Sequence, residues 1–390
     1  MEDIGLASAL QSLHRVAPQD LPDAVSRIAG RMGAYDLIAY LVDFEQSTLF
    51  PLPDRGPHVD TPVAVPIEGT PEGSAFLERR VIAIPSGDTH RVYAPIIEGS
   101  DVTGVLALSV VGPADDRGRH LCAQLGLLVG SAVSVAARAT DHFNVVRRRR
   151  AMSLPASIQW DLLPPLRLTA PGVSSEGVLE PAYDVGGDCF DHSVNGSTVD
   201  LAIMDAMGHG LDSSVASSLA VSSYRHGRRE GRPLSVLHRR IDGVLADQFG
   251  GQRFVTGQLA RLDLLTGRLA WINAGHPLPL HLRDGTVLAT LACRPTLPWG
   301  LGGTLREEAA VDLEPGDSVV FFTDGAFEGR TPAGEPFGMD RFVELVERTA
   351  SGRRPTGVDL RSCVREVLDH QANDLRDDAT ILWLDWTPEG

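Results

Sequence analysis

Apolar residues recur along the first 115 positions at the spacings of two helices followed by several strands. A short helix is predicted near the start, and a second contains Leu21, Val25, Ile28 and Met32. Apolar runs typical of strands follow at 35–44, 81–84, 92–97 and 102–111. The Pro- and Gly-rich segment from Leu52 to Gly73 is expected to be a loop. This pattern predicts a compact α+β module over residues 1–115.

The next stretch, residues 116–150, repeats apolar positions in steps of four and three. These positions are Leu121, Leu125, Leu128, Ala132, Val135, Ala139, His142 and Val146. Sustained heptads predict a coiled-coil linker helix and a parallel homodimer. The alternative is one long helix packed on the sheet of its own domain, which the further apolar residues Leu127, Val129 and Val133 favour. The run from Arg147 to Arg150 is interpreted as a solvated helix end.

Residues 151–390 contain two apolar runs joined by Asn195-Gly196, a pair typical of a type I′ hairpin turn. With these two residues as the loop, Asp188 lies opposite Ile203 and Asp205 lies one diagonal step further. Both carboxylates then share a face with Cβ atoms about 7 to 8 Å apart, a span that a divalent cation can bridge. The alternative is that both acids cap turns, which is ordinary for Asp beside Gly.

Further acids stand at the ends of other predicted strands. Asp324 follows the apolar run from Ser318 to Phe322, and the pair Asp377-Asp378 precedes the run from Ile381 to Leu384. Carboxylate oxygens without clustered Cys or His favour Mg²⁺ or Mn²⁺ over Zn²⁺. Two such ions can bind phosphoryl oxygens and activate a bridging water for in-line attack. The acids therefore predict a metal centre suited to phosphate esters.

Other elements of this stretch are also predictable. Helices are expected at 211–225, 233–249, 340–350 and 358–372, with an antiparallel meander over 254–291. Four serines at the start of the first of these helices, Ser213, Ser214, Ser217 and Ser218, are small enough for close packing. The loop over 292–303 is interpreted either as a docking site for a protein substrate or as a plain connection.

Composition limits the class of protein. A length of 390 residues and an apolar content of 43% are sufficient for two domains. A net charge of −16 argues against nucleic acid or an anionic membrane as a general partner. The four cysteines are scattered, which is typical of a reducing cytoplasm. No uninterrupted apolar run reaches membrane-spanning length, and the acidic N-terminus lacks a basic signal region. A soluble cytoplasmic protein is therefore expected.

Five ordered segments resemble the motif set of PPM-type metal-dependent Ser/Thr phosphatases, the protein phosphatase 2C superfamily, and more closely its SpoIIE/RsbU-like branch. They are Tyr183–Asp188, Asp205–Gly210, Asn273–Pro277, Phe322–Gly325 and Asp377–Thr380. The resemblance covers roughly residues 155–386. One departure is that Cys189 and Phe190 follow the Gly-Gly-Asp, where the branch usually has bulky aromatic residues.

The resemblance implies a fold and a metal-ligand set. The fold is an α-β-β-α antiparallel sandwich that holds two or more Mn²⁺ or Mg²⁺ ions at one end. The residue matching Asp205 bridges both metals, and the carbonyl of Ala206 is also a ligand. The remaining implied ligands are Asp188, Asp324 and Asp377, with Asp378 as a possible substitute for Asp377. His209 and His276 are interpreted either as proton donors or as structural residues of Gly-rich turns.

Two resemblances concern regulation. Residues 1–115 resemble a GAF sensory domain, which implies a small ligand or partner, or a degenerate fold that only dimerises. The segment from Ala151 to Pro165 resembles a short helix that, in the branch, connects the regulator to the phosphatase. We hypothesise that movement of this helix decides whether Asp188 and Asp205 can bind metal. Unchanged metal affinity and turnover after deletion of residues 1–150 would reject this hypothesis.

The sequence thus predicts a GAF-like domain at 1–115, a coiled-coil linker helix at 116–150 and a PPM-type phosphatase domain at 151–390. The implied substrate is a phosphorylated protein, and in this branch it is often an anti-sigma-factor antagonist. The first alternative is a pseudophosphatase scaffold that binds a partner without catalysis, although the full set of acids argues against it. The second alternative is a hydrolase for a small phosphate ester.

Overall fold

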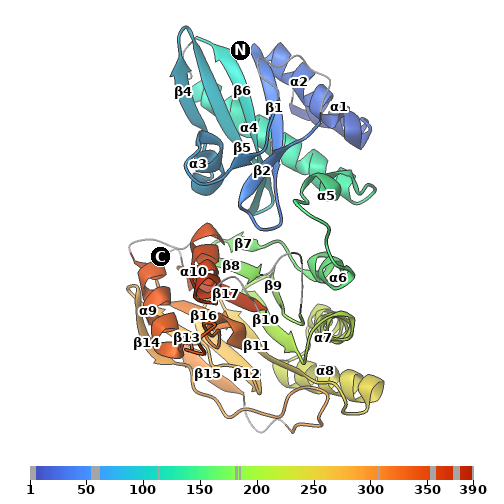
Figure 1. The fold of residues 1–390 in the computed structure, drawn as a ribbon, viewed down its shortest axis with the longest axis vertical. Helices are drawn as coiled ribbons and strands as arrows, with labels where there is room; N and C mark the ends of the chain where they lie inside the picture. Colours follow the sequence, from blue (N-terminus) through green and yellow to red (C-terminus); the bar gives the residue numbers. More distant parts are fainter. Residues whose placement is uncertain are drawn as a thin grey trace. The chain divides into compact units, whose positions relative to one another are not determined.

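The computed structural model describes residues 6–53, 62–112, 115–180, 183, 186–304, 308–351, 357–371 and 378–388 (Figure 1). The chain divides into two compact units, Met1–Ala151 and Met152–Gly390. Each unit has its own β-sheet structure and its own hydrophobic core.

The N-terminal unit contains a six-stranded antiparallel sheet in the order β3-β2-β1-β6-β5-β4. Its strands are β1 (Ala34–Val42), β2 (Thr48–Pro51), β3 (Val65–Pro66), β4 (Ile82–Ser86), β5 (Thr89–Glu98) and β6 (Asp101–Val111). Its helices are α1 (Leu6–His14), the 3₁₀ turn η1 (Pro18–Asp20), α2 (Leu21–Arg31), α3 (Pro71–Glu78), α4 (Asp116–Ala137) and α5 (His142–Val146). The predicted α+β organisation is confirmed.

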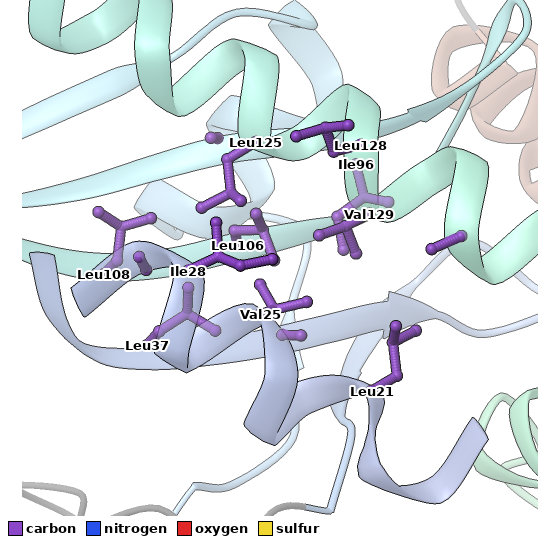
Figure 2. Close-up of a cluster of buried hydrophobic side chains, with 14 of the residues drawn as sticks. Leu21, Val25, Ile28, Leu37, Ile96, Leu106, Leu108, Leu125, Leu128 and Val129 are labelled. Atoms are coloured by element: carbon purple, nitrogen blue, oxygen red, sulfur yellow. The ribbon is translucent and has the colours of Figure 1, made fainter. Parts of the chain in front are cut away.

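Helices α1, α2 and α4 pack on one face of this sheet. Figure 2 shows Val25 and Ile28 of α2 and Leu125 and Val129 of α4 gathered around Leu106 of β6. These apolar side chains are removed from water together, which is the main stabilising contribution to this unit.

The expectation of a loop from Leu52 to Gly73 is partly wrong, because β3 and the start of α3 lie within it. Thr70 caps α3 by accepting a hydrogen bond from the Gly73 N–H at 3.0 Å. Pro71 occupies the first helical position, where no amide donor is needed. The Pro-Gly composition therefore marks a helix start as well as a connection.

The helix predicted over 116–150 is not continuous. The helix breaks after Ala137, and a short second helix, α5, follows. The heptad positions Leu125, Leu128 and Ala132 belong to the core of their own unit. A Cβ atom on Gly126 would overlap the carbonyl oxygen of Pro95 in β5, so α4 lies directly against this strand. These contacts favour the alternative of a helix packed on its own sheet, and the coiled coil and the dimer stay predictions.

Helix α4 also has the length and apolar composition of a membrane span, the one such helix in the described part of the chain. Its most apolar window is 44% buried within its own unit. That burial, together with the close approach to β5, is typical of the core helix of a soluble domain.

The arginine run that follows α5 contacts the turn between β1 and β2. Arg147 Nε donates to the Val42 carbonyl at 2.8 Å, and its guanidinium lies 4.6 Å from the centre of the Phe44 ring. Arg149 Nη1 pairs with Glu45 at 2.7 Å. The run therefore joins the end of the first unit to its own sheet, and two of its charges have partners there.

The C-terminal unit consists of two antiparallel sheets between two pairs of helices (Figure 1). The first sheet has the order β15-β12-β11-β10-β9, with β9 (Cys189–Asn195), β10 (Thr198–Ala206), β11 (Val255–Asp263), β12 (Arg268–Ala274) and β15 (Ala309–Asp312). The second has the order β14-β13-β16-β17-β8-β7, with β7 (Arg167–Ala170), β8 (Val173–Glu180), β13 (Leu280–Arg283), β14 (Thr286–Thr290), β16 (Ser318–Phe322) and β17 (Ala379–Trp386).

Three apolar clusters connect these layers. One lies between the sheets, a second packs α7 (Leu211–Arg229) and α8 (Leu234–Phe249) on the first sheet, and a third packs α9 (Met339–Ala350) and α10 (Gly357–His370) on the second. The predicted α-β-β-α layers are therefore present. A short helix, α6 (Leu154–Leu162), precedes the sandwich, and the 3₁₀ turn η2 (Asp324–Ala326) follows β16.

The hairpin of β9 and β10 forms, but its register differs from the prediction by two residues. Asn195 pairs with Thr198, so the loop is Gly196-Ser197. Gly196 has a φ of +62°, whereas Ser197 is not among the residues with positive φ, an arrangement that fits a type II′ turn. Continuing this register places Asp188, just before β9, in line with Asp205 and no longer diagonal to it.

The loop over 292–303 is tied to the first sheet. Trp299 is fully buried, and its main chain exchanges hydrogen bonds with Val255 at 2.8 and 3.0 Å. Its indole N–H donates to His238 Nδ1 at 2.8 Å. These contacts favour the interpretation of this loop as a structural connection.

Candidate metal centre

Four of the predicted acidic residues lie at one end of the sandwich. Asp188 precedes β9, and Asp205 near the end of β10 pairs with Thr256 of β11. Asp324 follows β16 after Thr323, and Asp378 directly precedes β17, the antiparallel neighbour of β16. Antiparallel strands run in opposite directions, so the C-terminal end of one lies beside the N-terminal end of the next. The structure therefore brings together side chains that are far apart in the sequence.

Asp188 links the two sheets. Its side chain is almost completely buried, and its Oδ2 accepts hydrogen bonds from Thr323 Oγ1 and Thr380 Oγ1, both at 2.7 Å. Burial raises its pKa well above the usual range, and the charges of Asp205 and Asp378 raise it further. The hydroxyl bonds act in the opposite direction without reversing the shift. A cation beside these carboxylates would favour their ionised forms, so the residues fit a bound metal.

Asp378 faces the backbone of the Gly-Gly-Asp loop. Both of its carboxylate oxygens accept the Gly186 N–H at 2.9 Å, and Oδ2 also lies 3.3 Å from the Asp188 N–H. These bonds hold the loop that carries Asp188, a role that the sequence did not predict. Asp377 lies outside the described residues, so the choice between the two acids as ligand stays a prediction.

The Ala206 carbonyl, which the resemblance makes a ligand, lies against Gly187. The Ala206 N–H donates to the Gly187 carbonyl at 3.3 Å. A Cβ atom on Gly187 would overlap the Ala206 carbonyl oxygen and would lie 2.8 Å from the Ala206 Cβ. Glycine is therefore needed here because the two backbones approach closely.

Asp324 begins the η2 turn beside these groups. It is partly buried, and burial raises its pKa, while main-chain N–H groups partly oppose the shift. The preceding residue, Thr323, bonds Asp188, and a Cβ on the following Gly325 would overlap the Asp378 carbonyl. Asp324 and Asp205 therefore lie at the same end of the sandwich, as the enzyme hypothesis requires.

Within the described ranges, no three His, Cys, Asp or Glu side chains are arranged as a complete metal site. The predicted ligand set also counts the Ala206 carbonyl and Asp377, and the latter is not described. The assignment of individual ligands therefore stays a prediction.

Two serines of α7 and a glutamine of α6 hold the carbonyls of the loop. Ser213 Oγ donates to Gly186 O at 3.2 Å, and Ser217 Oγ donates to Gly187 O. Gln159, also buried, donates from Nε2 to the Asp188 carbonyl. From the sequence, these serines were expected only to allow close packing. Their four-residue spacing, which puts both on one helix face, was the available signal.

Phe190 accounts for the departure from the motif pattern of the branch. Its ring fills the space beside Gly177 of β8, where a Cβ would overlap it, and Cys189 faces the helix layer. The two residues thus pack in opposite layers beside Asp188.

His276 is a structural residue in this arrangement. Its ring Nδ1 lies 2.9 Å from Thr256 Oγ1, and its main-chain N–H donates to Asn273 Oδ1 at 2.8 Å. Burial lowers its pKa to about 3, so the ring is neutral near pH 7. His209 is exposed in the Gly-His-Gly turn after β10.

A second buried histidine, His192, should make the free energy of unfolding depend on pH. His192 Nε2 lies 2.7 Å from the Pro165 carbonyl and therefore donates to it, while Nδ1 lies 3.1 Å from Ser175 Oγ. Burial lowers its pKa to about 4. Below about pH 6.5, the ordinary pKa of histidine, the unfolded chain binds a proton at His192 while the folded chain does not yet do so. His192 is therefore expected to contribute no pH dependence above that pH and to lower the free energy of unfolding by about 2 kcal/mol by pH 5, and buried His276 acts in the same direction.

Urea unfolding between pH 7.5 and 4.5 measures this slope. His192→Gln should make this slope shallower even if the variant is less stable overall, whereas the exposed control His226→Gln should leave the slope unchanged. An unaltered slope in His192→Gln would contradict the assignment.

Comparisons with known proteins agree with this geometry. Residues 195–387 match the family model Stage II sporulation protein E (SpoIIE). Protein IcfG of Synechocystis is 23% identical over 261 residues, which cover 59% of this chain and 38% of that protein. Phosphoserine phosphatase RsbP of Bacillus subtilis is 23% identical over 172 residues, which cover 41% of this chain and 42% of that protein. The matched segments thus span about two fifths of these curated relatives.

A solved structure shares the fold. The SiaA-PP2C domain of Pseudomonas aeruginosa superposes with a TM-score of 0.50 at 22% identity, covering 59% of this chain and 94% of that domain. The C-terminal unit of this chain therefore has a PP2C-like fold, and within it residues 195–387 match the SpoIIE family model.

Proposed function

We propose that the C-terminal unit is a metal-dependent phosphatase that removes phosphate from phosphoserine or phosphothreonine of a protein. The observation that carries this proposal is the buried carboxylate of Asp188, whose pKa is raised by burial and by two neighbouring acids. Such a group is costly to keep ionised without a cation. Metal binding explains a buried carboxylate beside two further acids at one sandwich end better than structure alone.

Asp188, Asp205 and Asp324 would hold the ions, together with the Ala206 carbonyl and Asp377 or Asp378. Bound Mn²⁺ or Mg²⁺ would supply charge stabilisation and an activated water. The protein's own contribution is orientation. Thr323 and Thr380 fix one oxygen of Asp188, and its other oxygen could bind a metal ion. No side chain needs to form a phosphoenzyme.

The substrate class rests on the relatives. Phosphoserine phosphatase RsbP is named for its action on phosphoserine, and the branch that the motifs resemble often acts on anti-sigma-factor antagonists. We therefore propose a phosphorylated antagonist of this kind as the substrate. The cytoplasm is the proposed location, and a dimer of the GAF-like unit is the proposed regulator.

Contacts of α6 support the switch hypothesis. Gln159 reaches the Asp188 carbonyl, and the Leu162 carbonyl at the helix end accepts from Arg225 Nη2 at 2.6 Å. Arg225 and Arg228 of α7 both pair with the buried Asp191 of β9. A displacement of α6 would therefore disturb both the loop and α7. The deletion of residues 1–150 described above tests this.

Phosphate release from a phosphoprotein tests the proposed function. Purified full-length protein is expected to release phosphate with Mn²⁺, to lose this activity in EDTA and to regain it when Mn²⁺ is restored. Mn²⁺ should also raise the unfolding temperature of the C-terminal unit, because the ion binds only the folded state.

Two other outcomes would favour the alternatives. Mn²⁺ binding without release from any phosphoprotein or small ester would support the pseudophosphatase scaffold. Release from small esters alone would support a small-molecule hydrolase.

A further inference from the structure

The Gly187 carbonyl receives two hydrogen bonds that connect α7 to the metal centre. One comes from Ser217 Oγ of α7 and the other from the Ala206 N–H at 3.3 Å. Ala206 is also the residue whose own carbonyl is a proposed ligand. The Gly187 peptide therefore links the Ser217 side chain of α7 to Ala206, a proposed ligand of the site.

The serines of α7 differ in what their hydroxyls contact. Ser214 and Ser218 bond carbonyls four residues earlier, Gly210 O at 3.1 Å and Ser214 O at 2.7 Å. This is the ordinary local bond of serine within a helix. Ser217 instead reaches the loop, and Ser213 contacts both Gly210 O at 2.8 Å and Gly186 O at 3.2 Å.

Ser213 and Ser217 are also buried among apolar neighbours. Both are at most 2% exposed, and the adjacent helix positions Ala216 and Ala220 belong to the apolar cluster between α7 and the first sheet. A buried hydroxyl requires a hydrogen-bond partner. The loop carbonyls supply that partner, so the helix and the loop each satisfy a polar group of the other.

We propose that Ser217, supported by Ser213, is a positioning residue that sets the metal affinity of the site. Its hydroxyl fixes the Gly187 peptide and, through it, the direction of the Ala206 carbonyl. Without the hydroxyl, the Gly187 carbonyl keeps only the longer bond from Ala206, and the peptide gains freedom to rotate. This inference rests on the proposed function, because it assumes that the site binds a metal.

Mn²⁺ binding to the full-length chain tests the proposal, with electron paramagnetic resonance of the free ion as the readout. Ser217→Ala is expected to weaken Mn²⁺ binding about fivefold to tenfold, the effect of one lost hydrogen bond. The matched control Ser218→Ala lies on the same helix and does not contact the loop, so its affinity should stay near that of the wild type.

Phosphate release separates positioning from a direct role in the chemical step. The Mn²⁺ concentration for half-maximal release should rise in Ser217→Ala, while turnover at saturating Mn²⁺ changes by less than about twofold. Loss of turnover at saturating Mn²⁺, with unchanged affinity, would overturn the proposal.

A second variant keeps the test decisive if Ser217→Ala misfolds. Ser213→Ala removes the neighbouring bond and should weaken Mn²⁺ binding by about threefold. Wild-type affinity in a folded Ser217→Ala or, failing that, in Ser213→Ala would overturn the positioning role and leave the phosphatase proposal intact. A wild-type chain that binds no Mn²⁺ would overturn both.

Discussion

Asp205→Asn is expected to lower phosphate release at least about a hundredfold. Mutation of residues that only hydrogen-bond to metal ligands already lowers metal affinity or activity by about 10- to 100-fold, and loss of a ligand should cost more. Asparagine keeps the shape of the side chain but loses the negative charge that holds a divalent ion. Asp205 also raises the pKa of Asp188. Its neutralisation should therefore relieve repulsion in the metal-free protein, and the unfolding temperature without Mn²⁺ should stay level or rise.

Asp324→Asn should give the same loss of release without relieving repulsion on Asp188. Asp324 is not among the groups whose charge raises the pKa of Asp188. The control Asp312→Asn removes an exposed acid of β15 paired with Arg268 and should behave like the wild type. Retained turnover in both Asp205→Asn and Asp324→Asn would contradict the metal mechanism.

Gly187→Ala should impair metal binding and phosphate release as strongly as the two aspartate variants do, although it changes no charge. The new Cβ would overlap the Ala206 carbonyl oxygen, which is main chain and cannot move aside without shifting the end of β10. We expect Mn²⁺ binding to weaken by about a hundredfold or more and phosphate release to fall with it, because misplacement of about 1 Å can have this effect.

The matched control is Gly243→Ala in α8. A Cβ at this position meets nothing within 4 Å, and alanine is preferred in a helix by about 1 kcal/mol. This variant should be slightly more stable and fully active. Wild-type Mn²⁺ affinity in Gly187→Ala would show that the loop has room that the structure does not contain.

Much of the site could be predicted because its acids stand where apolar runs end. Asp324 and the Asp377-Asp378 pair flank strands whose apolar character is unambiguous, and β16 and β17 do form there. The hairpin register could not be derived, because Gly196 suits the second position of a type I′ turn as well as the first position of a type II′ turn. The two choices differ by two residues and leave the same faces buried.

The coiled coil is not confirmed, and the sequence was ambiguous there for a related reason. Steps of four and three describe any helix with one apolar face, whether the partner is another helix or a sheet of the same domain. Gly126 and Gly130 on that face were the distinguishing signal, because they allow close contact with a strand. The roles of Ser213 and Ser217 were equally hidden, since small residues on a buried helix face also fit simple packing.

The hydroxyls that hold Asp188 come from the opposite sheet, 135 and 192 positions later in the chain. Contacts of such long range form late in folding, since the closure of a large loop precedes them. During synthesis, a ribosome-bound chain that has completed the first sheet but not β17 would lack Thr380 and the acids beside it. Newly made protein would thus lack a complete site until β17 has left the ribosome.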